Sequence, residues 1–81
     1  MSHSRFSKEE IARRGKELYA QNIRAQVETK DNIGKIVSID IETSDYEIGE
    51  DVIRSSERLL AKHPDAALYG IRIGYNAVYS L

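Results

Sequence analysis

Residues Lys35–Ile48, which read KIVSIDIETSDYEI, decide the fold because apolar and polar side chains alternate along them. Successive side chains of a β-strand point to opposite faces, so the alternation predicts a strand over the first half of this stretch. Val37, Ile39 and Ile41 are expected to face the core. The polar residues between them are expected on the other face of the sheet.

The second half of the stretch predicts a returning strand and therefore a hairpin. Thr43-Ser44 is the expected two-residue turn. That turn pairs Ile41 with Tyr46 and Ile39 with Ile48 on the apolar face. Because the polar residues also fall opposite one another in this register, the pattern supports the hairpin on both faces.

A long helix is predicted before the hairpin, over residues 7–29. Ser7 and Glu10 have the spacing of a capping box, in which a hydroxyl and a carboxylate satisfy free amides at a helix start. Apolar residues then recur at helical spacing. Gly15 costs about 1 kcal/mol relative to alanine in a helix interior, so we expect another backbone to pack closely there.

Behind the hairpin the sequence predicts a second helix over Glu50–His63. Two acids occupy its first turn, where the helix dipole favours them, and Pro64 ends it. Alternating apolar residues predict a strand over Ala67–Tyr75. A short fourth strand is expected at Ala77–Ser80, after a turn.

The expected fold class is α+β, with the order helix, hairpin, helix, strand and a small antiparallel or mixed sheet on which the helices pack. One domain is expected over residues 1–81, made of a flexible N-terminus at 1–6, the helix at 7–29 and a ββαβ core at 34–80. The predicted core consists of the apolar residues of these elements: Val37, Ile39, Ile41, Ile48, Val52, Ile53, Leu59, Leu60, Ile71 and Ile73.

Composition excludes several classes of protein. The 81 residues contain no cysteine, which removes disulfides, thiolate catalysis and cysteine-based zinc sites. The two histidines, His3 and His63, are far apart, and no segment is apolar enough for a membrane span or a signal peptide. We therefore expect a cytoplasmic protein that uses neither metal nor cofactor.

Charge is distributed unevenly along the chain. Residues 1–30 hold seven bases and four acids, whereas residues 31–81 hold five bases and nine acids. Such a split is typical of a basic arm that contacts nucleic acid, or of two halves that attract each other within a fold or a dimer. Both interpretations stay open. The residues that would dimerise or contact DNA lie on the first helix: Arg13, Arg14, Lys16 and Arg24.

Four carboxylates are predicted on the polar face of the hairpin, on Asp40, Glu42, Asp45 and Glu47. Opposed like charges destabilise a strand pair. Arg72, on the non-core face of the third strand, is the expected compensating charge if that strand is adjacent; solvent or a basic partner is the alternative. These five residues are the candidates for binding a protein partner.

The string Ile39–Thr43 also resembles the first motif of the exonuclease superfamily with four acidic metal ligands. Asp40 and Glu42 would then hold a divalent metal from one face of a strand. The other acidic motifs of that superfamily are missing, so a metal-dependent nuclease is a remote alternative. His63 is expected to act as a cation at a helix end, since no serine or aspartate is spaced to form a relay with it.

Residues 34–79 resemble a group of small uncharacterised cyanobacterial proteins, through GKIVSIDIET and DYEI and again through RLLAKHPDA and LYGIRIGY. The resemblance implies an antitoxin or adaptor half of a two-gene operon, with no activity or site settled for the group. The group commonly has Gly where this chain has Ser44, and often Pro at Asn76. These departures bear on the turn and on the end of the third strand.

The expected function is a small, non-enzymatic interaction protein, an antitoxin-like or regulatory partner of a second protein. A homodimer is expected, because small cores without staples usually recruit a partner and the long first helix outreaches a small sheet. The alternative is a structural homodimer with no role in nucleic-acid binding.

Overall fold

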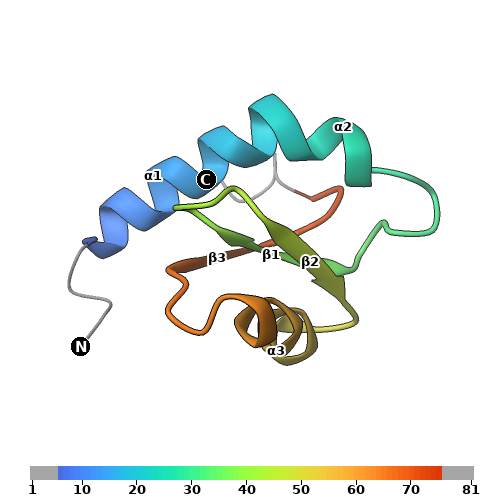
Figure 1. Cartoon of the computed structure of the whole chain (residues 1–81). Coiled ribbons are helices and arrows are strands. Elements are labelled where there is room, and N and C mark those ends of the chain that lie inside the picture. Colours follow the sequence, from blue (N-terminus) through green and yellow to red (C-terminus); the bar gives the residue numbers. More distant parts are fainter. Residues whose placement is uncertain (1–5, 76–81) are drawn as a thin grey trace.

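The computed structural model describes residues 6–75 (Figure 1). Its elements, in chain order, are α1 (Lys8–Leu18), the π-helical turn η2 (Tyr19–Ile23), α2 (Arg24–Val27), β1 (Ile36–Asp40), β2 (Tyr46–Gly49), α3 (Val52–Lys62) and β3 (Leu68–Arg72). This is the predicted α+β order. The predicted fourth strand at Ala77–Ser80 and most of the expected flexible N-terminus lie outside the described residues.

The long first helix is confirmed, since α1, η2 and α2 follow one another without a break. The Ser7 hydroxyl accepts a hydrogen bond from the Glu10 amide at 3.1 Å, as the capping pattern predicts. The π-helical turn was not predicted. In an α-helix, each residue lies about 40° around the axis from the residue four positions before it. The wider π-helical turn removes part of this rotation. Tyr19, Ile23 and Val27, which are all buried, therefore stay on one side of the helix.

The sheet has three strands in the order β2-β1-β3, and both strand pairs are antiparallel. The predicted hairpin register is wrong by two residues, because Ile39 lies opposite Tyr46 and Val37 opposite Ile48. A shift of two residues leaves every side chain on its predicted face. The loop therefore has four residues, between Asp40 and Asp45, where a two-residue turn was predicted. The Asp45 carbonyl accepts a hydrogen bond from the Asp40 amide at 2.9 Å.

Helices cover both faces of the sheet, with α1, η2 and α2 on one side and α3 on the other (Figure 1). The main core lies under the first helix. Its buried members come from that helix, from β1 and from the residue after β3: Tyr19, Ile23, Val27, Val37, Ile39 and Ile73. Ile48 and Ile71 are half-buried and pack against this core, as predicted in part.

At the middle of the α3 face of the sheet, small residues lie opposite each other, Ser38 on β1 and Gly70 on β3, so α3 lies close there. The Ser38 hydroxyl on β1 is 2.8 Å from the Ser55 hydroxyl on α3, and both residues are fully buried. Leu59 is buried on the same side of α3, as predicted. Since helix side chains four apart share a face, Ser55 and Leu59 together define the buried side of α3.

Three predicted core residues are therefore wrong. Val52, Ile53 and Leu60 are 54%, 64% and 36% exposed. They lie on one flank of α3, where Val52 borders the Ser55–Leu59 side and lies beside Gly70 of β3, while Ile53 and Leu60 are turned further from that side toward solvent. A small serine, rather than Ile53 or Leu60, faces the middle of the sheet.

Gly15 allows α1 to approach β3. A methyl group at this position would overlap the ring of Tyr69. The close neighbour expected at Gly15 is thus present, but it is an aromatic side chain and not a backbone. Among residues 6–75, no helix is long and apolar enough to cross a membrane.

Candidate functional site

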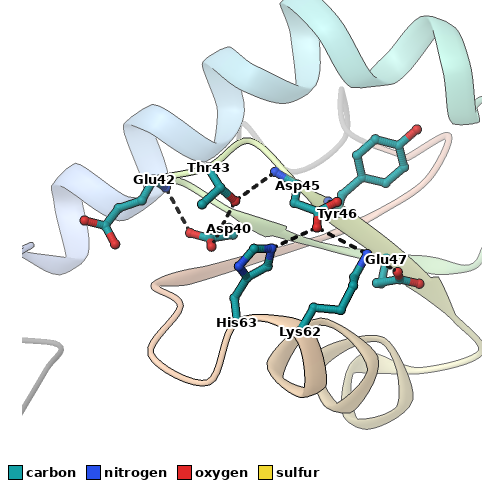
Figure 2. A network of polar contacts seen from close by, with 8 residues as sticks. All are labelled: Asp40, Glu42, Thr43, Asp45, Tyr46, Glu47, Lys62 and His63. Carbon is teal, nitrogen blue, oxygen red and sulfur yellow. Dashed lines mark hydrogen bonds and ion pairs between the residues drawn. The ribbon is translucent and has the colours of Figure 1, made fainter.

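The acidic hairpin is bound to the end of α3 by two cationic side chains (Figure 2). The Lys62 ammonium lies 2.6 Å from a Glu47 carboxylate oxygen and 3.2 Å from one of Asp45. His63 Nε2 lies 2.9 Å from the same Asp45 oxygen. Two of the four predicted acids are therefore compensated within the chain.

These contacts shift the ionisation of the groups that make them. Hydrogen bonds from His63 and Lys62 hold the pKa of Asp45 below its ordinary value. Hydrogen bonds to Glu47 and Asp45 raise the pKa of Lys62. Since Asp45 and Lys62 each favour the charged form of the other, both stay ionised around neutral pH.

The predicted compensation by Arg72 is wrong. β1 lies between β3 and β2, and Arg72 pairs with Ile36 at the opposite end of β1 from Asp40, so Arg72 lies away from the hairpin's acids. Its guanidinium donates to the Gly34 carbonyl at 3.1 Å and lies 5.8 Å from the centre of the Tyr75 ring.

Asp40 has a structural task in the hairpin loop. Its carboxylate is buried and accepts hydrogen bonds from the Glu42 amide and from the Thr43 hydroxyl, each at 3.0 Å (Figure 2). Glu42 is exposed and lies beyond the end of β1. Asp40 and Glu42 therefore do not project together from one strand, as the remote nuclease alternative would require.

His63 has an aspartate partner after all, because the four-residue loop carries Asp45 to it. A histidine and an aspartate alone do not make a nucleophilic site. The nearby Thr43 hydroxyl donates to Asp40 instead. Within residues 6–75, no three His, Asp or Glu side chains converge on a point where a metal ion could bind.

A shallow hollow of about 230 Å³ opens beside this network. Residues of the hairpin loop and of the turn after α3 line it: Asp40, Glu42, Thr43, Lys62, His63, Pro64, Asp65 and Ala66. Its rim carries more acids than bases, so a cationic side chain of another molecule is the group that suits it best.

The basic candidates on the first helix are mostly paired with its own acids. Arg14 lies 3.4 Å from Glu10, and Arg13 lies 3.9 Å from Glu17. Lys16 is exposed. With two arginines paired in this way, the helix does not present an uncompensated row of cations to phosphates.

Arg24 is held further along the same helix, 3.4 Å from Glu28 and over the ring of Tyr19. The Tyr19 hydroxyl donates to Glu28 at 2.7 Å. Burial and this carboxylate raise the pKa of Tyr19 to about 12. Arg24 thus belongs to a local network rather than to an open basic surface.

A second surface was missed by the sequence interpretation. We call Val52, Ile53 and Leu60 the α3 flank; all three are exposed, and Val52 lies beside Gly70 of β3. An apolar patch that large side chains leave open on a small protein is typical of an interaction site. The signal was present in the sequence as extra apolar residues on α3, but periodicity alone assigned them to the core.

The α3 flank adjoins an open edge of the sheet. Ala67 and Ile73 lie directly before and after β3. The Ala67 carbonyl accepts a hydrogen bond from the Ile41 amide at 3.1 Å, and the Ile73 amide donates to the Lys35 carbonyl at 2.8 Å. Because inward and outward groups alternate along an antiparallel strand, the amides and carbonyls of Leu68 and Gly70 point outward. No strand in the described part of the chain pairs with them.

Comparisons with family models, curated proteins and solved structures found no match to this chain.

Proposed function

We propose that this chain is a small, non-enzymatic interaction protein that acts by binding another polypeptide. The observation that carries the proposal is the α3 flank beside the open edge of β3. Exposed aliphatic side chains next to backbone donors and acceptors that no strand within residues 6–75 uses are the two components of β-strand addition. In that mode the backbone supplies affinity and the side-chain contacts supply specificity.

The polar network favours a non-enzymatic role. The Asp40 carboxylate accepts hydrogen bonds from the hairpin loop, one of them from the Thr43 hydroxyl, and His63 is hydrogen-bonded to Asp45. Each of these side chains, which general acid–base or nucleophilic chemistry could use, has a partner within the described part of the chain. The acidic hollow suits a secondary contact with a basic residue of the partner.

The narrower role of an antitoxin-like or regulatory partner rests on the resemblance of residues 34–79 to the cyanobacterial group. A cytoplasmic location rests on the lack of cysteine. Contact with DNA through Arg13, Arg14, Lys16 and Arg24 has little support from the geometry, because most of these bases are ion-paired.

The test is backbone amide exchange on the full chain, alone and with whatever polypeptide it binds. We expect the amides of Leu68 and Gly70 to exchange more slowly in the bound form, and Ile53→Glu to abolish both the binding and the protection. Arg13→Glu, a change of similar severity on the opposite helix, serves as the control. Binding that survives Ile53→Glu but is lost in Arg13→Glu would move the interaction surface to the first helix.

A further inference from the structure

The two outer edges of the sheet differ. On β2, the Arg58 guanidinium donates to the outward carbonyl of Ile48 and so covers that edge. On β3, the outward groups of Leu68 and Gly70 face no other strand within residues 6–75. An uncovered strand edge is a template for another strand.

We infer that a second copy of this chain occupies the β3 edge, through antiparallel pairing of two β3 strands about Gly70. This inference rests on the proposed function, because it names the partner of the same surface. The result is a continuous six-stranded sheet with the order β2-β1-β3-β3-β1-β2.

The strand is complementary to itself. Its outward groups belong to alternate residues centred on Gly70. A two-fold axis at Gly70 sets Leu68 of each copy opposite Arg72 of the other, and outward groups then meet outward groups. An axis at Tyr69 or Ile71 would pair only two of the three outward residues of β3, whereas the axis at Gly70 pairs all three.

The axis also brings the exposed aliphatic residues together. A Val52 methyl lies 3.6 Å from the point that a Cβ of residue 70 would occupy. Hydrogen-bonded residues of an antiparallel pair have Cα atoms about 5.5 Å apart. The two Val52 side chains therefore meet above the axis, and each adjacent Ile53 flanks the contact.

Charge favours the same arrangement. Arg72 is the only charged residue of β3. Each Arg72 faces a leucine in this register, so no like charges oppose each other across the new strand pair. An unrelated extended segment would have to match the register, the charge and the Val52 contact separately, whereas a second copy matches all three by symmetry.

A single-cysteine variant tests the geometry, because the chain contains no cysteine of its own. A side chain is tolerated at Gly70, since among the described residues only Val52, at 3.6 Å, lies within 4 Å of the added Cβ. Two cysteines there lie within the Cα separation of about 4.4–6.8 Å that a disulfide spans. Ala20→Cys, exposed on η2 on the opposite layer, is the matched control.

We expect Gly70→Cys to form a covalent dimer when dissolved oxygen and copper phenanthroline oxidise it, and Ala20→Cys to remain monomeric. Sedimentation equilibrium should show the wild-type chain approaching twice the monomer mass as its concentration rises. Ile53→Glu should raise the dissociation constant by about tenfold or more. Because Ile53 is exposed in the monomer, the melting temperature of the monomeric Ile53→Glu variant should equal that of the monomeric wild type.

Three results would overturn the inference. The first is equal cross-linking of the two cysteine variants, and the second is a wild-type chain that stays monomeric at every concentration. The third is protection of the Gly70 amide that does not depend on concentration, which would assign the edge to residues 76–81 of the same chain. A monomeric chain that still binds another polypeptide through Ile53 would remove the second copy and leave the proposed function standing. A chain that binds neither a second copy of itself nor another polypeptide would remove both the inference and the proposed function.

Discussion

The hydroxyl groups of Ser38 on β1 and Ser55 on α3 lie 2.8 Å apart in a contact that is closed to solvent. This pair sets the distance between α3 and the sheet. The Ser55 hydroxyl also bonds to the Val52 carbonyl at 3.2 Å, so its hydrogen-bonding capacity is used within the two elements.

We predict that Ser55→Leu destabilises the protein far more than Ser55→Ala. Alanine leaves the Ser38 hydroxyl with Ser56, 3.2 Å away, and should cost about 1 kcal/mol of unfolding free energy. Leucine forces extra atoms into a closed contact and should cost about 1–3 kcal/mol or more. Urea unfolding measures both, and equal midpoints for the two variants would contradict the assigned contact.

Neighbouring leucines of α3 should respond differently to truncation. Leu59 is fully buried, so Leu59→Ala should cost about 2–5 kcal/mol. Leu60 is 36% exposed, and Leu60→Ala should cost much less. Thermal melts of the two variants give the comparison, and a larger loss at Leu60 would restore it to the core.

A third prediction concerns the loop between β1 and β2. Ser44 has φ of 70°, a left-handed conformation that costs a residue with a side chain about 1–2 kcal/mol relative to glycine. Ser44→Gly should therefore raise the stability by up to about 1 kcal/mol, less the entropy that glycine adds to the unfolded chain. Ser44→Ala keeps the strain and should give no gain. A Ser44→Gly melting point at or below that of the wild type would argue against this loop conformation.

The tyrosine hydrogen bonds offer a matched pair of variants. Tyr19 is buried, and its hydroxyl donates a hydrogen bond to Glu28. The Tyr46 hydroxyl donates to Gln26 at 2.6 Å in an exposed position. Tyr19→Phe should cost about 1.5–3 kcal/mol, as for a hydrogen bond to a charged group, whereas Tyr46→Phe should cost less. The unfolding free energies of the two variants would be compared, and the opposite ranking would contradict the Tyr19–Glu28 network.

Stability should fall in acid because of Asp45. Its folded pKa is depressed below the ordinary value of 3.8, so its contribution is present above pH 3.8 and is lost as the pH falls through the folded value. Asp45→Asn should remove this part of the acid dependence, whereas Asp31→Asn, at an exposed position, should leave it intact. Urea midpoints between pH 2 and 6 provide the measurement. A wild-type acid dependence that persists in Asp45→Asn would mean that other carboxylates carry it.

The fold could be predicted from the sequence where one local pattern dominates. The Ser7 cap, the alternation along β1 and Pro64 each set an element boundary that the structure reproduces to within a few residues. The hairpin register could not be predicted, because it depends on the Asp40 carboxylate, which closes a four-residue loop through Thr43. No spacing rule reveals that an acid within a strand will serve the next turn.

The candidate site could be predicted less well, for two physical reasons. Compensation of the hairpin's acids depends on which element lies above β2, and that element is α3 with Lys62 rather than β3 with Arg72. The exposed residues of α3 were assigned to the core because apolar periodicity does not show how much room the facing layer has. Here the close contact of Ser38 with Ser55 leaves no room for Ile53 or Leu60, and Val52 reaches the sheet only at its edge, beside Gly70.

The contact of Gly15 with Tyr69 joins segments that are far apart along the chain. While the protein is being synthesised, the first helix can meet β1 and β2 before β3 exists, but the contact of Gly15 with Tyr69 has to wait for β3. The main core is completed only then, because its last buried member, Ile73, follows β3. Full assembly of the N-terminal helix onto the sheet therefore waits for nearly the whole of residues 6–75.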